Sequence, residues 1–113
     1  MHELSVAMGI IRIAEEELSK SSAHTIEAIE LEIGDLAGIE LDSLEYVWDA
    51  AVRGTVLEKA QRKIHRIGVR GVCLVCDQES ELEQHFDSCP NCNSFLKHVL
   101  QGKELRVKAL QVV

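Results

Sequence analysis

Four cysteines arranged as two C-x-x-C pairs constrain this 113-residue chain more than any other feature of its sequence. The pairs are Cys73-Leu-Val-Cys76 and Cys89-Pro-Asn-Cys92, and twelve residues separate them. Zinc in structural sites prefers four ligands in a tetrahedron, and two intervening residues let both sulfurs of a pair reach one ion from a tight turn. The spacing therefore predicts a four-cysteine zinc site. Because such a site has no open position for water, we expect it to stabilise the fold and not to catalyse a reaction.

Other uses of clustered cysteines fit the rest of the chain less well. Two disulfides would suit a secreted protein, but the start Met-His-Glu lacks the basic head and small-residue cleavage site of a signal peptide. No apolar run approaches the roughly 20 residues that a membrane helix needs. We therefore expect a soluble, cytoplasmic protein, in which clustered cysteines more often hold metal. An iron–sulfur cluster and a redox dithiol remain as alternatives to zinc.

The hydrophobic periodicity predicts two amphipathic helices. Residues 4–18 repeat apolar side chains at the i, i+3, i+4 spacing of a helix. A second stripe begins where Asp42 and Glu45 resemble a capping box, or one turn earlier, and Arg53-Gly54 ends it.

Alternating apolar and polar residues predict strands at 29–33, 64–72 and 105–109, with a bulge or twist near Glu27. Two helices on a small, mostly antiparallel sheet, with an inserted four-cysteine zinc-ribbon module, form an α+β fold. We expect residues 1–70 and 100–113 to form one α/β domain and residues 71–99 to form the zinc module.

The charge distribution argues against a nucleic-acid partner. The net charge is −7, and residues 1–40 alone hold nine acidic and two basic side chains. Binding to phosphate is driven by Lys and Arg. A basic run does occur at Arg62, Lys63, Arg66 and Arg70, with His65 among them. We interpret this run as a solvated strand face, and docking onto an acidic partner is the alternative.

The N-terminus offers a second group of metal donors. Histidine is large, so we expect Met1 to be retained ahead of His2. The Met1 amine and the His2 amide can close a five-membered chelate ring, the His2 imidazole closes a six-membered ring, and the Glu3 amide can supply a fourth nitrogen. Nitrogen donors in a plane suit Ni(II) or Cu(II), although imidazole also suits Zn(II). On its own, a histidine at the second position is usually accidental.

The combination of these features resembles a known family. A chain of this length that opens Met1-His2-Glu3-Leu4-Ser5 and carries the two cysteine pairs is similar to the hydrogenase nickel-insertion accessory family HypA/HybF. Leu31-Glu32-Ile33-Gly34 and Arg53-Gly54-Thr55 extend the likeness, which covers the whole chain.

The resemblance implies a function and a set of site residues. Members of this family are non-catalytic metallochaperones that receive Ni(II) and help to deliver it to the large subunit of NiFe-hydrogenase, and some also serve urease. They work with a nickel-handling GTPase partner. The resemblance places the nickel ligand at His2, with Glu3 in nickel handling or partner contact. It places the zinc ligands at Cys73, Cys76, Cys89 and Cys92. The family's nickel domain joined to a zinc domain agrees with the α+β fold expected above.

Two other function classes compete with this interpretation. An enzyme needs an activated nucleophile or an acid–base pair, but every cysteine is assigned to the metal site, and no Gly-x-Ser-x-Gly or Walker-type loop occurs. A zinc-ribbon module that binds protein or nucleic acid without labile nickel is the more serious rival. The sequence leaves open the target nickel enzyme and whether the protein is a monomer or a homodimer.

Overall fold

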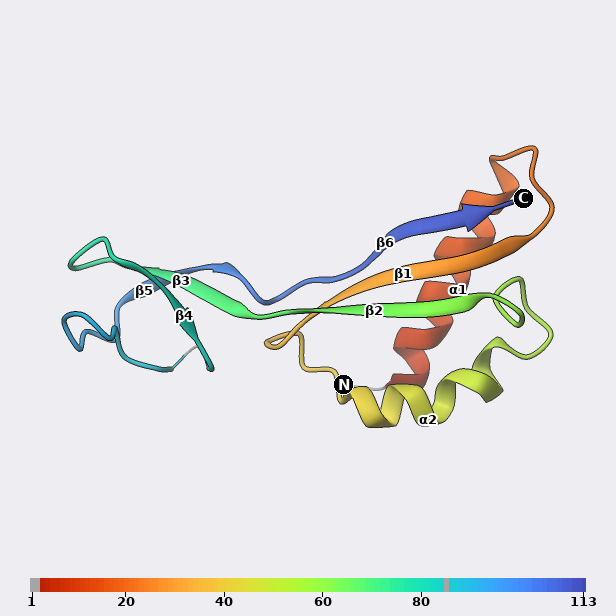
Figure 1. Ribbon diagram of the computed structural model, residues 1–113. Coiled ribbons are helices and arrows are strands. Elements are labelled where there is room, and N and C mark those ends of the chain that lie inside the picture. The colour runs from red at the N-terminus through yellow and green to blue at the C-terminus, as the bar shows by residue number, and fades with distance from the viewer. Residues whose placement is uncertain (1–2, 85) are drawn as a thin grey trace. The chain divides into compact units, whose positions relative to one another are not determined.

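The computed structural model describes residues 3–84 and 86–113 (Figure 1). The helices are α1 (Glu3–Ser19) and α2 (Leu41–Val52), and the strands are β1 (Ile26–Gly34), β2 (Gln61–Ile67), β3 (Val69–Cys73), β4 (Glu79–Leu82), β5 (Lys97–Gln101) and β6 (Leu105–Val112). The strands form two three-stranded sheets, in the orders β2-β1-β6 and β4-β3-β5. The predicted α+β class, with two helices, small antiparallel-rich sheets and a four-cysteine module, is confirmed.

The described chain divides into two compact units. Unit 1 comprises residues 3–32, 39–65 and 106–113, and unit 2 comprises residues 33–38 together with the described part of 66–105. Unit 2 contains all four cysteines and is larger than the predicted zinc module of residues 71–99. The assignment of 1–70 and 100–113 to nickel, and of 71–99 to zinc, stays a prediction.

Unit 1 has a core made from one face of each helix and one face of the sheet. Its buried apolar side chains are Ala7, Ile10, Ile11, Ala14, Ile26, Ile29, Leu31, Leu44, Trp48, Val52 and Leu57. α1 and α2 pack against each other, and α1 crosses the strands of the sheet (Figure 1). In β1 the buried positions Ile26 and Ile29 lie three residues apart, so the alternation changes phase beside Glu27, where the sequence predicts a bulge or twist. The helical stripe predicted for residues 4–18 is confirmed.

The start of α2 differs from one prediction. The helix begins at Leu41 and its N-cap is Glu40, which makes no side-chain capping hydrogen bond. The predicted capping box at Asp42 and Glu45 is therefore wrong, because both residues already lie inside the helix. The predicted end is confirmed, since α2 stops at Val52.

Unit 2 contains a sheet in which β3 lies between two antiparallel neighbours. The single strand predicted over residues 64–72 is wrong. Two strands occupy this stretch, β2 and β3; the break falls at Gly68, and the two strands belong to different sheets. β4 folds back onto β3, so that Val69 lies opposite Leu82 and Val72 lies opposite Glu79.

Two glycines allow the loop at 33–38 to pack closely within unit 2. A Cβ atom on Gly34 would lie 2.1 Å from the carbonyl oxygen of Gly102, which is far inside van der Waals contact. Gly102 itself has φ +121°, a conformation that side-chain-bearing residues rarely adopt. The Gly34 N–H donates to the Glu104 carbonyl at 2.7 Å, and the Leu36 N–H donates to the Gly102 carbonyl at 2.7 Å. These bonds fasten the loop to the chain that leads from β5 to β6.

Most of the basic side chains of this run, and His65 among them, contact carboxylates of the same chain. The pairs are Arg62 with Glu45, His65 with Glu30, Arg66 with Asp35, and Arg70 with both Glu79 and Glu81. The hydrogen bond from His65, at 2.7 Å, lowers the pKa of the Glu30 carboxyl below its ordinary value of 4.5. The run is therefore largely neutralised within the chain. No helix in the described residues is long and apolar enough to cross a membrane.

Candidate metal centres

The four cysteines of unit 2 converge on one point. Cys73 is the last residue of β3, Cys76 lies in the turn after it, and Cys89 and Cys92 lie in the turn that precedes β5. The Sγ atoms of Cys73 and Cys92 are 3.5 Å apart, those of Cys76 and Cys89 are 3.7 Å apart, and all four lie within 4.8 Å of one another. This is the one group of His, Cys, Asp and Glu side chains in the described chain with the spacing to hold a metal ion.

Each C-x-x-C pair is shaped by its own main chain. In the first pair the N–H of Val75 donates to Cys73 Sγ at 3.4 Å, and the N–H of Asp77 donates to the Cys73 carbonyl at 3.0 Å. Asp77 has φ +61°, which turns the chain sharply after Cys76. With this turn, the Sγ atoms of Cys73 and Cys76 lie within 4.8 Å of each other.

The second pair repeats this arrangement sixteen residues later. The N–H of Asn91 donates to Cys89 Sγ at 3.4 Å, and the N–H of Asn93 donates to the Cys89 carbonyl at 2.8 Å. Asn93 has φ +65°, as Asp77 has φ +61° in the first pair. Asn and Asp are the side-chain-bearing residues that most readily take this left-handed conformation. The two turns are therefore equivalent halves of one site.

The sulfur geometry fits a tetrahedral zinc ion. Four sulfurs held about 2.3 Å from one ion stand about 3.8 Å apart at the corners of a tetrahedron. The Cys73–Cys92 and Cys76–Cys89 separations, 3.5 and 3.7 Å, are close to this value, and the other Sγ separations are no longer than 4.8 Å. A disulfide would need about 2.05 Å, and all four cysteines are free thiols. The donor set, four thiolates from two short turns, is the one that zinc takes in closed structural sites.

The electrostatics of the cluster also favour a cation. The N–H groups of Cys76 and Val75 lower the pKa of Cys73. The side-chain amide of Asn91 and then the N–H of Gln78 lower the pKa of Cys76 to about 6. The N–H of Ser94 acts to lower the pKa of Cys92, but the neighbouring thiols and desolvation outweigh it and raise that pKa to about 12. A bound divalent cation would supply positive charge that favours the thiolate form of these sulfurs.

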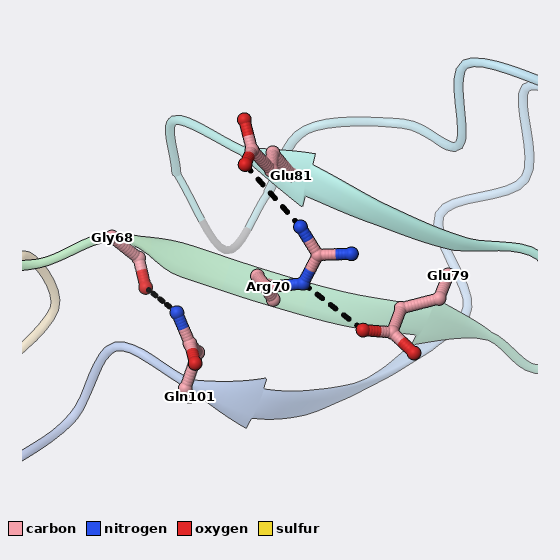
Figure 2. A network of polar contacts seen from close by, with 5 residues as sticks. All are labelled: Gly68, Arg70, Glu79, Glu81 and Gln101. Atoms are coloured by element: carbon pink, nitrogen blue, oxygen red, sulfur yellow. Dashed lines mark hydrogen bonds and ion pairs between the residues drawn. The ribbon is translucent and has the colours of Figure 1, made fainter.

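A network of polar contacts braces the sheet that carries Cys73 (Figure 2). The Arg70 guanidinium donates through Nε to Glu79 at 3.0 Å and through Nη1 to Glu81 at 3.3 Å, which joins β3 to β4. Gln101 Nε2 donates to the Gly68 carbonyl at 3.0 Å, which joins the end of β5 to the start of β3. Sequence patterns did not single out this brace, because its partners become neighbours only through the pairing of β3 with β4 and β5.

The second predicted site lies largely outside the described residues. The sequence predicts nickel donors at Met1, His2 and the Glu3 amide, and neither Met1 nor His2 is among the residues that the structure describes. Glu3 is described and is the first residue of α1. Its Oε2 atom accepts a hydrogen bond from the main-chain N–H of Glu40 at 3.2 Å. The sequence gives no sign of this contact, because 37 residues separate the partners.

Comparison with known proteins decides the family. A family model described as "Hydrogenase/urease nickel incorporation, metallochaperone, hypA" matches residues 1–112. The chain belongs to the HypA family. It is 42% identical over 112 residues to the hydrogenase maturation factor HypA of Parabacteroides distasonis, covering 99% of this chain and 97% of that protein. It is 40% identical to the HypA of Azotobacter chroococcum, covering 99% of both chains.

Solved HypA structures share the fold. The solution structure of the Ni metallochaperone HypA from Helicobacter pylori superposes with a TM-score of 0.70 at 25% identity, covering 100% of this chain and 98% of that one. A second solution structure, of a HypA protein, gives a TM-score of 0.72 at 25% identity, covering 100% of this chain and 97% of that one. The resemblance read from the sequence is confirmed. HypA is a family of nickel metallochaperones for hydrogenase and urease maturation, and it is not a family of enzymes. A role in maturation implies that its members act together with other maturation components.

Proposed function

We propose that this chain is a nickel metallochaperone that binds Ni(II) at its N-terminus and helps to deliver it to the large subunit of NiFe-hydrogenase during maturation. The observation that carries the proposal is the family match over residues 1–112, which includes the Met1-His2-Glu3 start. Urease is the second candidate target, because the description of the family names it beside hydrogenase. The nickel ion is cargo and binds transiently.

In this proposal the N-terminal segment supplies the nickel donors. The Met1 amine, the His2 amide and the His2 imidazole form two fused chelate rings, and the Glu3 amide supplies a fourth nitrogen. Four nitrogens in a plane match the geometry that Ni(II) prefers. A site with four or fewer ligands at the end of a chain is open to an incoming ligand, so a recipient protein can take the ion.

In the same proposal zinc is held permanently by Cys73, Cys76, Cys89 and Cys92. Four thiolates complete the tetrahedron, so the ion has no position for substrate and serves the fold. We assign this site to a zinc module of residues 71–99 and the nickel site to the domain formed by residues 1–70 and 100–113. Within this module, the N–H···S bonds of the two turns hold the sulfurs of Cys73 and Cys89 in place.

The proposed partners are a nickel-handling GTPase accessory protein and the hydrogenase large subunit, in the cytoplasm. The net charge of −7 and the pairing of most of the basic run with carboxylates make binding to nucleic acid or to an anionic membrane surface unfavourable. We propose no catalytic activity for the chain. A monomer and a homodimer are both compatible with the proposal.

One experiment distinguishes the proposed nickel metallochaperone from the rival function, a zinc-ribbon binding module without labile nickel. Untagged protein, protein with an N-terminal extension and the His2→Ala variant are dialysed to equilibrium against Ni(II), with zinc already bound. The proposal expects one nickel per chain in the untagged protein and loss of that nickel in the other two. Equal nickel binding by all three samples would show that neither the amine nor His2 is a ligand.

A further inference from the structure

The four cysteine sulfurs of unit 2 differ in how easily a reagent in solution can reach them. Cys73 and Cys89 are buried, with 4% of each residue exposed, Cys76 is half-buried, and Cys92 is exposed. Cys92 lies in the turn that precedes β5, and the residues on both sides of it are exposed as well. Accessibility and thiolate character together decide which cysteine reacts first, and accessibility favours Cys92.

Hydrogen bonds from nitrogen donors separate Cys92 from Cys76, the second most accessible cysteine. The Cys76 sulfur accepts from two such donors, the side-chain amide of Asn91 and the main-chain N–H of Gln78. The Cys92 sulfur accepts from one, the main-chain N–H of Ser94. A donor that stabilises a thiolate also makes it a weaker nucleophile. Zinc holds all four sulfurs as thiolates, so these donors favour reaction at Cys92 over reaction at Cys76.

We propose that Cys92 is the zinc ligand that hydroperoxides oxidise first, and that Cys73 then forms a disulfide with it, so that the zinc ion is released. The inference rests on the proposed function, in which all four sulfurs hold zinc. The Sγ atoms of Cys73 and Cys92 are 3.5 Å apart, and a disulfide needs about 2.05 Å, so a movement of about 1.5 Å is sufficient.

The oxidation proceeds in two steps. In the first, the Cys92 thiolate attacks an oxygen of the hydroperoxide; an S–O bond forms, the O–O bond breaks, and an alkoxide or hydroxide leaves. In the second, the Cys73 thiolate attacks the resulting sulfenic acid; an S–S bond forms, the S–O bond breaks, and hydroxide leaves. The two sulfurs together lose two electrons, which reduce the hydroperoxide. Zinc keeps only two of its four thiolates, too few to complete its tetrahedron.

Peptide mass spectrometry of the zinc-loaded wild type tests both steps. In limited alkylation with iodoacetamide, Cys92 should react before Cys76 and about tenfold faster than the buried Cys73 and Cys89. With less than one equivalent of hydrogen peroxide, followed at once by alkylation, the first disulfide should join Cys73 to Cys92. A chromogenic chelator should detect one zinc ion released for each disulfide formed. In urea with a chelator, all four cysteines should react at similar rates, because the fold no longer shields any of them.

Two variants test the part played by the nitrogen donors. Asn91→Ala removes the amide donor of Cys76 and keeps the main-chain N–H that donates to Cys89. Alkylation of Cys76 should become about threefold faster, while the rate at Cys92 stays the same. Asn93→Gly removes a neighbouring amide and suits the φ of +65° at that position, so it is the matched control and should keep the wild-type order.

Several results would overturn the inference. They are first alkylation of the wild type at any cysteine other than Cys92, a first disulfide between any other pair, and disulfide formation without zinc release. An unchanged rate at Cys76 in Asn91→Ala, or an equal increase in Asn93→Gly, would also contradict it. Failure of the proposed zinc site has a different signature, which is less than one zinc ion per chain in the wild type before any reagent is added.

Discussion

Removing zinc should unfold unit 2 and leave unit 1 folded. Among the described residues, the buried hydrophobic side chains of unit 2 are Ile33, Val69, Cys73 and Cys89. Burying Ile33 and Val69 contributes about 1.5–3 kcal/mol each. Zinc binding contributes on the order of 10–16 kcal/mol in small zinc-finger peptides. Zinc binding therefore contributes more free energy to the folding of unit 2 than its apolar core does. The eleven buried apolar side chains of unit 1 should hold that unit folded without a metal.

The chain contains a reporter for each half of this prediction. Trp48 is the single tryptophan, is 3% exposed and lies in unit 1. During a chelator titration its emission should stay constant, while the amide NMR signals of unit 2 collapse to the narrow range of an unfolded chain in step with zinc release. Cys89→Ala should reproduce the effect of the chelator, and Ser88→Ala, at the adjacent position, should not.

Two results would refute this reasoning. A red shift of the Trp48 emission in step with zinc loss would show that unit 1 depends on the metal. Dispersed amide signals from unit 2 after complete zinc removal would show that its apolar contacts are sufficient without the ion.

Three further predictions concern the fold. Gly34→Ala should destabilise unit 2 by about 1–3 kcal/mol or more, because the added methyl group would lie 2.1 Å from the Gly102 carbonyl oxygen. Urea unfolding followed by NMR measures the loss of stability, and an unchanged unfolding midpoint would contradict the prediction. The lowered pKa of Glu30, bonded to His65, stabilises the fold above the ordinary pKa of 4.5, and this contribution is lost as the pH falls through the lower folded-state value. The acid unfolding of unit 1, followed by tryptophan emission, should therefore depend less on pH in Glu30→Gln than in the wild type, and identical pH profiles would argue against it. Leu44→Ala removes a fully buried side chain of α2 and should cost about 2–5 kcal/mol in the unfolding of unit 1, whereas a loss below about 1 kcal/mol would contradict the packing described.

The sequence predicted correctly those features that are specified by residues close together along the chain. The helical stripes and the cysteine pairs are of this kind, because a helix face and a metal-binding turn are each specified within a few residues. The single strand predicted over 64–72 was wrong because the change from one sheet to another depends on distant segments and not on neighbouring residues. Apolar residues continue through Ile67 and Val69, and nothing local shows that the chain passes from one sheet to another at Gly68.

Contacts between distant segments were not accessible in this way. The Glu3 carboxylate and the Glu40 N–H meet only after α1 and α2 have packed together. Arg70 belongs to the basic run that the sequence presents as a solvated face, yet the pairing of β3 with β4 places Glu81 opposite it and Glu79 close by. Such partners follow from strand register and helix packing, which a single sequence does not specify.

X-ray absorption at both metal edges of one sample loaded with zinc and nickel tests the central claim most directly. Two separate sites with different donors should give two different coordination shells. At the zinc edge we expect four sulfur ligands at about 2.3 Å, matching the cluster in which all Sγ atoms lie within 4.8 Å. At the nickel edge we expect nitrogen ligands and no sulfur. Sulfur in the nickel shell would show that nickel occupies the cysteine site, and nitrogen or oxygen in the zinc shell would show that zinc is not held by the four cysteines alone. Either result would contradict this account.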